Sequence, residues 1–367
     1  MASKLDAIRT ELNTLFVERT AEVNALLVCL VAKQHMLLIG PPGTAKSALV
    51  RALCERIGAS YFNWLLTKFS TPEELFGPVS LQSLKAGKYE RIIAGKLPEA
   101  EVAFLDEIFK ANSAILNSCL TVLNERLYHN NGGAVKCPLQ FAVGASNEFP
   151  QGEELGALFD RFLVRFVVQY ISEDAGFEAL LKGSSAKLTK LSTKELEAEQ
   201  TAAASVTVPD KVLAEVVGLR RALGAEGIVV SDRRWRESLS LVRAAAHLAG
   251  RVEAENADLE VLCSVLWSDP SQRDKVAEVV MKVANPFKRQ ALEFADEVTS
   301  IFKDKDLNSA DAVTEIRKKL KDVAKRVVEA TKVAKANGAD STALVAVEDR
   351  IRTENKALVA KFLDLEG

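Results

Sequence analysis

The sequence predicts a three-layer α/β domain with a parallel sheet, followed by regions that are entirely helical. Five short apolar runs in the first half have the length and composition of buried parallel strands. They cover residues 35–39, 61–66, 102–105, 139–145 and 163–168. Helical patterns lie between them, notably over residues 46–57 and 111–125, and such alternation is typical of a three-layer architecture. No strand pattern follows residue 171, so we expect the second half to be helical.

The chain contains 367 residues, which is too many for one ordinary core and fits two or three domains. A polar stretch rich in Lys, Ser, Thr and Glu ends the α/β pattern, and Asn285 followed by Pro286 marks a later boundary. Pro209 and Ser231 are placed to begin two helices between these boundaries. We therefore divide the chain into an α/β domain (residues 1–182), a linker or exposed helix (183–206), a helical domain (207–285) and a C-terminal helical region (286–367).

Composition and charge argue against several classes of protein. The formal net charge is -2, so no global basic field exists to hold nucleic acid or anionic lipid through phosphate contacts. The N-terminal segment lacks the apolar core of a signal peptide, and the longest apolar run, residues 25–32, is too short to cross a bilayer. The five cysteines form no C-x-x-C pair, which favours free thiols in a reducing compartment. We expect a cytoplasmic protein without a membrane span, with nucleic acid disfavoured as a partner.

A segment rich in glycine and proline joins the first predicted strand to the helix predicted over residues 46–57. It consists of Gly40, Pro41, Pro42, Gly43, Thr44, Ala45, Lys46 and Ser47. In this context backbone N–H groups and a helix N-terminus face one concavity and bind phosphate oxygens. Lys46 would add a positive charge at the β- and γ-phosphates, and the Ser47 hydroxyl would ligate Mg²⁺. Ala45 stands where the pattern has a second glycine, and a turn with a chance Lys–Ser pair is the alternative interpretation.

Two carboxylates, Asp106 and Glu107, follow the third predicted strand. The strand would place both at its carboxyl end, where ligands bind in open α/β sheets. There Asp106 would hold magnesium, directly or through water, and Glu107 would polarise the attacking water as general base. An acidic pair at a strand end is by itself often a helix cap. Together with the phosphate-binding loop, it predicts a site for ATP or ADP with Mg²⁺.

Several longer phrases contain or extend these motifs. They are GPPGTAKS at residues 40–47, ELFGPVS at 74–80, FLDEIFKAN at 104–112, LNERLYHN at 123–130 and FDRF at 159–162. As a set they resemble the MoxR family of AAA+ ATPases over residues 5–285, and SDRRW at 231–235 is similar to its RavA-like branch. The resemblance implies an α/β ATPase domain with an insertion in its second helix, a helical lid and a homo-oligomeric ring, usually a hexamer. It also implies a chaperone-like function that remodels or matures a protein client, together with a partner containing a von Willebrand factor A domain.

The resemblance adds two residues of the α/β domain to the predicted site. Asn147 matches the polar residue that positions the attacking water beside Glu107, with capping of the following turn as the alternative role. Arg161 matches the arginine finger that reaches the γ-phosphate bound by the neighbouring subunit. A salt bridge from Arg161 to Asp160 or Glu153 is the alternative.

Other matches are less specific. Arg233 matches the lid arginine that touches nucleotide in its own subunit, but the adjacent Arg234 leaves that assignment open, and Arg165 is a second finger candidate. Residues 77–95 match the insertion, and residues 128–136 read as a hairpin. Either element is a candidate surface for a client.

The resemblance ends in the C-terminal region. RavA-like proteins carry a small β-rich domain among their C-terminal helices, whereas residues 287–367 show helical periodicity only, with breaks near 306–309 and 337–338. We expect the helices without the β-rich domain. Two other functions remain compatible with the motifs: a nucleic-acid motor or loader, and a slow nucleotide-gated scaffold for an assembly.

Overall fold

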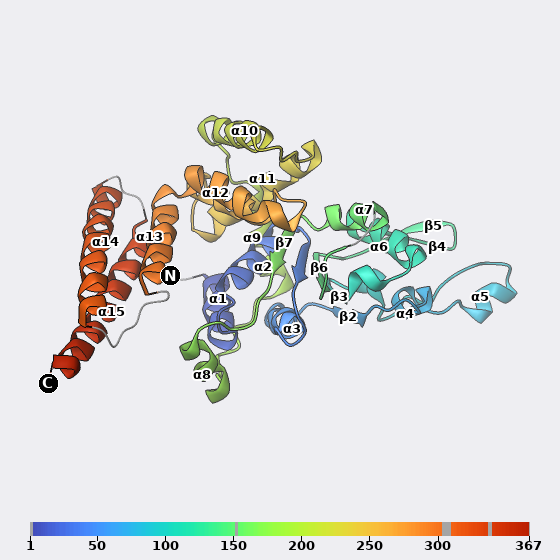
Figure 1. Ribbon diagram of the computed structural model, residues 1–367. Helices are drawn as coiled ribbons and strands as arrows, with labels where there is room; N and C mark the ends of the chain where they lie inside the picture. The colour runs from blue at the N-terminus through green and yellow to red at the C-terminus, as the bar shows by residue number, and fades with distance from the viewer. Residues whose placement is uncertain (1–2, 151–152, 303–309, 337–339, 367) are drawn as a thin grey trace.

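A five-stranded parallel sheet forms the centre of the computed structural model, which describes residues 3–150, 153–302, 310–336 and 340–366 (Figure 1). The strands are β1 (Met36–Ile39), β2 (Tyr61–Leu65), β3 (Val102–Asp106), β6 (Phe141–Ser146) and β7 (Val164–Val167). All five predicted apolar runs form these strands, and their order in the sheet is β2-β3-β6-β1-β7. Each neighbouring pair is parallel, so all the carboxyl ends meet at one edge of the sheet.

Helices flank this sheet. They are α1 (Lys4–Leu15), α2 (Thr20–Ala32), α3 (Lys46–Ile57), α6 (Ser113–Glu125) and α7 (Glu153–Arg161), whereas α8 (Asp174–Lys182), which follows β7, has no buried residue. Helix α1 begins with a capping box, in which Ser3 and Asp6 each accept the backbone N–H of the other. Helix α2 is buried on most sides, as its apolar composition requires.

An insertion leaves the sheet between β2 and β3 at the position that the sequence predicted. It contains α4 (Pro72–Phe76), α5 (Leu81–Lys85) and the 3-10 turn η1 (Leu97–Glu99). A backbone bridge joins Val79 to Arg91, and α5 lies far from the C-terminal helices (Figure 1).

The predicted hairpin consists of β4 (Leu127–Asn130) and β5 (Gly133–Lys136). Its turn residues Asn131 and Gly132 have φ values of +51° and +73°. Positive φ at both positions is the requirement of a two-residue type I′ turn, which Asn and Gly meet most easily.

The second helical part packs on the α/β domain through α9 (Thr193–Ala204) and α11 (Asp232–Leu248). It also contains α10 (Asp210–Ala225), the 3-10 segment η3 (Asn256–Ser264) and α12 (Arg273–Ala284). Within residues 183–206, for which the sequence predicted a linker or exposed helix, Thr193–Ala204 form α9, which is exposed on most sides and has one buried face. Its Leu196, Gln200 and Ala203 are buried where α9 packs on α2 and α11, and the Gln200 amide donates to the Leu30 carbonyl at 3.0 Å.

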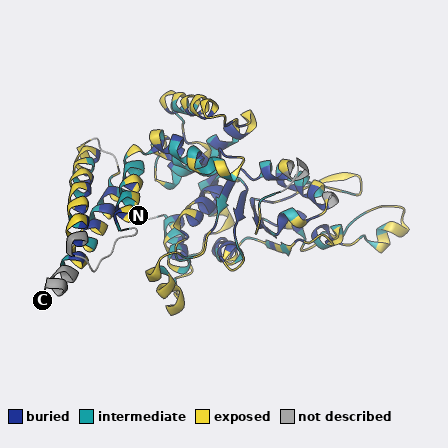
Figure 2. Ribbon diagram, in the orientation of Figure 1, coloured by how far each residue is buried: buried dark blue, intermediate teal, exposed yellow. Residues whose placement is uncertain are grey.

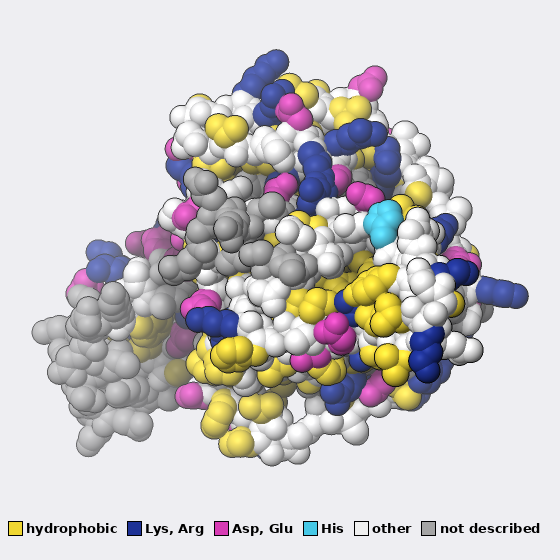
Figure 3. Space-filling model, turned by 90° about the vertical axis from the view of Figure 1, so that its right-hand side faces the viewer, with side chains coloured by type: hydrophobic (Ala, Val, Ile, Leu, Met, Phe, Trp, Pro, Cys, Tyr) yellow, Lys and Arg dark blue, Asp and Glu magenta, His cyan; other side chains and the backbone are white. Residues whose placement is uncertain are grey.

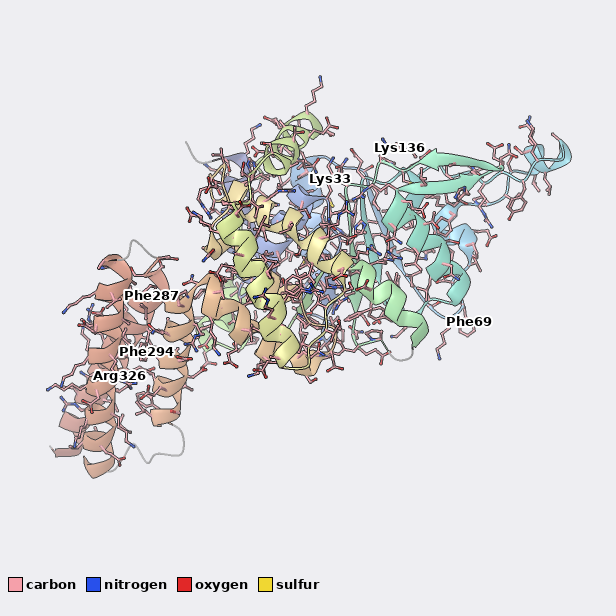
Figure 4. The ribbon with its side chains drawn as sticks, turned by 90° about the horizontal axis from the view of Figure 1, so that it is seen from above. Lys33, Phe69, Lys136, Phe287, Phe294 and Arg326 are labelled. Carbon is pink, nitrogen blue, oxygen red and sulfur yellow. The ribbon has the colours of Figure 1, made fainter. Side chains whose placement is uncertain are left out.

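The C-terminal helices α13 (Pro286–Phe302), α14 (Ala310–Ala336) and α15 (Thr342–Glu366) pack against one another beside the rest of the molecule (Figures 1 and 2). Their buried apolar side chains form a cluster separate from the main core. Arg326 of α14 lies over the ring of Phe294 of α13, 5.4 Å from its centroid (Figure 4). Every described element here is helical, and the predicted breaks at 306–309 and 337–338 lie outside the described residues. Within the described part of the chain, none of the helices has the length and hydropathy of a membrane-spanning segment.

A buried histidine makes the core sensitive to pH. His35 Nδ1 accepts the Ala142 N–H at 2.9 Å, and Nε2 donates to the Leu123 carbonyl at 2.7 Å. This pairing requires the neutral ring. Burial lowers the pKa of His35 to about 4, because desolvation disfavours the imidazolium.

We expect the free energy of unfolding to fall as the pH is lowered from about 7 to about 5. An unfolded histidine has a pKa near 6.5, so the contribution of His35 is complete above that value and is lost as the pH falls toward about 4. At a pH of about 5 the loss is about 2 kcal/mol. Urea unfolding of the parent chain and of His35→Gln measures it. The variant cannot titrate there and should show the weaker pH dependence; equal dependence in the two would contradict the assignment.

Candidate nucleotide-binding site

Residues 40–47 link β1 to α3 in a conformation that depends on small side chains. A Cβ on Gly40 would lie 2.1 Å from the carbonyl oxygen of Val168, so only glycine fits there. Gly43 and Ala45 have φ values of +81° and +63°. Ala45 therefore keeps the left-handed backbone of the glycine in the motif, at a cost of about 1 kcal/mol.

The loop presents backbone donors at the start of α3. Among the described residues, no acceptor is found for the N–H groups of residues 43–48. Such a set at a helix N-terminus, which carries a partial positive charge, fits a phosphate group.

Lys46 places its ammonium group against the same loop. Its Nζ donates to the carbonyl oxygens of Gly40 at 2.6 Å and Pro41 at 2.9 Å, and lies 3.3 Å from Asn147 Oδ1. Burial lowers the pKa of Lys46, and the charges of Asp106 and Glu107 oppose that shift. The positive charge is thus held by neutral acceptors, which phosphate oxygens can replace.

Strand order brings three predicted site residues together. Strand β6 lies between β1 and β3 in the sheet, so Asn147, which follows β6, lies between the loop and the carboxylates that end β3. The Asn147 amide donates to Glu107 Oε1, while its Oδ1 accepts from Lys46. Asn147 therefore bridges the phosphate-binding lysine and the predicted general base.

The second carboxylate oxygen of Glu107 can accept a further hydrogen bond. It is buried, lies 3.3 Å from Lys110 Nζ, and makes no hydrogen bond among the described residues. Buried polar atoms are normally hydrogen-bonded, so an oxygen that has an ion-pair contact but no hydrogen bond fits a water molecule that must be polarised. Lys110 was missed by the sequence analysis, although it lies inside the FLDEIFKAN phrase, three residues after Glu107.

Asp106 completes the group. Burial raises its pKa, and the neighbouring Glu107 charge acts in the same direction, while the Glu107 N–H, which Asp106 accepts at 3.1 Å, lowers it. A nearby cation would favour the ionised form. Carboxylate and hydroxyl oxygens are the donors that Mg²⁺ prefers, so Asp106 and Ser47 fit a magnesium ion that arrives with nucleotide.

The alternative role for Asn147 is taken by its neighbour. Ser146 Oγ donates to the Glu148 carbonyl at 2.6 Å and accepts the Glu148 N–H at 3.2 Å. Because Ser146 holds this turn, the Asn147 side chain is available to Glu107 and Lys46.

Arg161 is not brought to this site in its own chain. It ends α7 just before β7, whose first residue, Val164, pairs with Met36 at the start of β1. It therefore lies at the amino edge of the sheet, and the phosphate-binding loop lies at the carboxyl edge. The four residues of each strand separate these edges by about 13 Å.

The three other arginines differ in exposure. Arg165 and Arg234 are each 2% exposed and donate to backbone carbonyls of their own chain. The prediction of Arg165 as a second finger candidate is therefore wrong, because a side chain buried in this way cannot reach another subunit. Arg233 is exposed and pairs with Glu237 at 2.7 Å, so of the two lid arginines it is the accessible one.

One further contact was missed by sequence reasoning. The Tyr170 hydroxyl donates to the Pro42 carbonyl at 3.3 Å. Tyr170 follows β7 at the carboxyl edge of the sheet, and no motif in the sequence marked it.

The fold and this site define a P-loop nucleotide-binding protein of the AAA+ type. A family model described as the MoxR domain in MoxR–vWA–beta-propeller ternary systems matches residues 3–207, and a model of an AAA lid domain matches residues 211–280. The chain belongs to the MoxR family. Its place in the RavA-like branch stays a prediction from the SDRRW phrase.

Individual relatives agree with this assignment. Two uncharacterised proteins of Methanocaldococcus jannaschii are 40% and 39% identical to the chain, each over 81% of it and over 79% and 80% of their own lengths. Chaperone MoxR1 of Mycobacterium tuberculosis is 28% identical over 47% of this chain and 46% of its own. A crystal structure of a Cytophaga hutchinsonii protein assigned as an ATPase superposes with a TM-score of 0.63, covering 77% of this chain and 94% of that one. Its identity is 18%, so it shows the fold alone.

Proposed function

We propose that this chain hydrolyses ATP as part of a homo-oligomeric ring. The observation that carries the proposal is the Lys46–Asn147–Glu107 contact, which joins a phosphate-binding lysine to a buried carboxylate whose second oxygen makes no hydrogen bond among the described residues. Phosphoryl transfer to water needs a lysine that binds the phosphates and a carboxylate that activates the water.

Each residue has a defined role in this proposal. Lys46 and the N–H groups of residues 43–48 bind the phosphates, while Ser47 and Asp106 hold the Mg²⁺ of the substrate MgATP. Glu107 takes the proton from the attacking water, and Asn147 keeps its carboxylate in place. The metal, when bound, neutralises charge on the phosphates.

Two arginines complete the proposed reaction. Arg161 lies at the wrong edge of the sheet for its own site, which supports a role in the site of the next subunit. Arg233, exposed on the lid helix α11, is the better candidate for contact with nucleotide in its own chain.

We further propose that the ring remodels a protein client together with a partner that contains a von Willebrand factor A domain. The description of the matching family model supports the partner. The insertion exposes Leu81, Leu84, Tyr89 and Ile92, and Phe69 beside it is 89% exposed. Apolar side chains gather among charged ones on this end of the molecule, with Phe69 at its periphery (Figures 3 and 4). Exposed apolar side chains of this kind fit a protein client better than a polyanion.

Replacing Lys46 tests nucleotide binding directly. We expect Lys46→Ala to bind MgATP roughly 10- to 100-fold more weakly, because a charged hydrogen bond to phosphate contributes about 1.5–3 kcal/mol. Titration calorimetry measures the affinity. Lys194→Ala, an exposed lysine on α9, is the matched control and should bind like the parent. Unchanged affinity in Lys46→Ala would refute the site.

A further inference from the structure

We infer that Arg165 and Arg234 are positioning residues that couple the position of the lid to the position of Arg161. Through these two residues, the nucleotide bound by one subunit would determine the position of the Arg161 that the same subunit places in the site of its neighbour. The inference rests on the proposed role of Arg161 in the neighbouring site.

Both guanidinium groups hold the short segment that carries Arg161. They donate to the carbonyl oxygens of the two residues before it and the two after it: Phe159 (2.9 Å), Asp160 (3.1 Å), Phe162 (3.2 Å) and Leu163 (2.8 Å). The backbone on both sides of Arg161 is therefore fixed by side chains that are themselves buried.

The same two arginines also hold the lid. Arg234 belongs to the lid helix α11 and donates to the Val265 carbonyl at 2.9 Å. Arg165 donates to the Trp267 carbonyl, and its guanidinium lies 3.8 Å from the centroid of the Phe159 ring. The lid and the finger segment, residues 159–163, are thus held by the same two guanidinium groups.

The Asp160 carboxylate connects the two arginines. It lies 3.1 Å from Nη2 of Arg234 and 3.8 Å from Nη2 of Arg165. A guanidinium is a rigid planar fork, and leaving its buried donors unpaired is costly. When the lid shifts, the segment around Arg161 must therefore move with it.

This geometry gives a route from nucleotide to finger. Arg233, the exposed candidate for contact with nucleotide, is the residue before Arg234 on α11. A nucleotide that draws Arg233 inward also displaces Arg234. Because Arg234 donates to backbone carbonyl oxygens on both sides of Arg161, that backbone moves with it. The adjacent arginines of the SDRRW phrase then have different roles: Arg233 contacts the nucleotide, and Arg234 holds the segment around Arg161.

The first test separates turnover from binding. Arg234→Lys keeps the charge and loses the fork, so it should lower kcat roughly 10²-fold through misplacement of Arg161 while leaving KM for ATP unchanged. Arg236→Lys, an exposed arginine two residues further along α11, is the matched control and should behave like the parent. A raised KM with normal kcat in Arg234→Lys, or no defect at all, would overturn the inference.

The second test asks which subunit carries the defect. Arg234→Lys subunits mixed with Lys46→Ala subunits, which keep an intact finger, should regain activity because their own nucleotide sites are sound. Mixed with Arg161→Ala subunits, they should not, since neither partner then offers a well-placed finger. The reverse pattern would place the defect in the nucleotide site of Arg234→Lys and overturn the inference.

Asp160→Asn provides an independent arm should Arg234→Lys fail to fold. Its side chain is 42% exposed and the amide keeps its shape, so the change removes the charge between the arginines without changing side-chain size. It should show the same pattern on mixing, and normal kcat would count against the inference. Mixing Arg161→Ala with Lys46→Ala is the reference. Absence of rescue there refutes the proposed finger itself, which is a distinct failure.

Discussion

Glu107→Gln is expected to bind MgATP about as tightly as the parent chain and to release phosphate roughly 10²-fold or more slowly. General-base catalysis contributes about 10²- to 10⁴-fold, and an amide keeps the shape of the side chain without its basicity. The glutamine oxygen can still accept from Asn147, so the contact that holds this position in the structure is preserved. Titration calorimetry and a phosphate-release assay give the two measurements.

Glu148→Gln is the matched control for this variant. Glu148 is exposed one residue beyond Asn147, so its replacement removes the same charge near the same edge of the sheet without touching Glu107. It should turn over like the parent. Full hydrolysis by Glu107→Gln would mean that another group activates the water. Loss of both binding and turnover would mean that Glu107 supports the loop rather than the reaction.

Local patterns predicted most of the fold. The phosphate-binding loop and the hairpin that turns at Asn131–Gly132 are set by neighbours within a few residues, so the sequence alone shows them. The five strands were equally visible, because each lies in a short and largely apolar run, although β2, at the edge of the sheet, is only partly buried.

Contacts between distant segments were not predictable from one sequence. The family resemblance placed Asn147 beside Glu107, but the bridge from Lys46 through Asn147 depends on β6 lying between β1 and β3, which no local pattern reveals. Arg165 was a second candidate for the finger, yet carbonyls from two other segments hold it inside the molecule. The polar composition of residues 183–206 predicted a linker or exposed helix, but it did not show the narrow buried face that fixes α9.

Arg161→Ala is expected to bind MgATP normally and to be nearly inactive on its own. Lys46 and magnesium do not neutralise all the charge on the γ-phosphoryl oxygens in the transition state, and an added arginine is worth about 10³- to 10⁵-fold in rate. Arg165 and Arg234 are buried, and Arg161 lies at the opposite edge of the sheet from its own loop, so among the described arginines weighed for this role only Arg233 is accessible in the same chain. Steady-state phosphate release, with binding measured separately, shows whether the loss is in turnover alone.

Mixing distinguishes a finger from a structural residue. Lys46→Ala subunits bind nucleotide poorly but keep Arg161, and Arg161→Ala subunits have the opposite defect. If the arginine acts across a subunit boundary, mixed rings contain sites with an intact loop beside an intact finger, so part of the activity returns. Two inactive preparations that gain activity when combined cannot be explained by a fold defect in either.

Dilution gives the same argument without a substitution. A finger supplied by the next subunit makes turnover depend on assembly, so the specific activity of the parent chain should fall to near zero below the concentration at which rings dissociate. Sedimentation at matched concentrations fixes that threshold. A dilute monomer that stays fully active, or an Arg161→Ala chain that turns over normally, would exclude the finger. Loss of activity without rescue on mixing would instead make Arg161 a structural residue of α7, and the charge on the γ-phosphoryl group would then need a source in the same subunit, for which Arg233 is the exposed candidate.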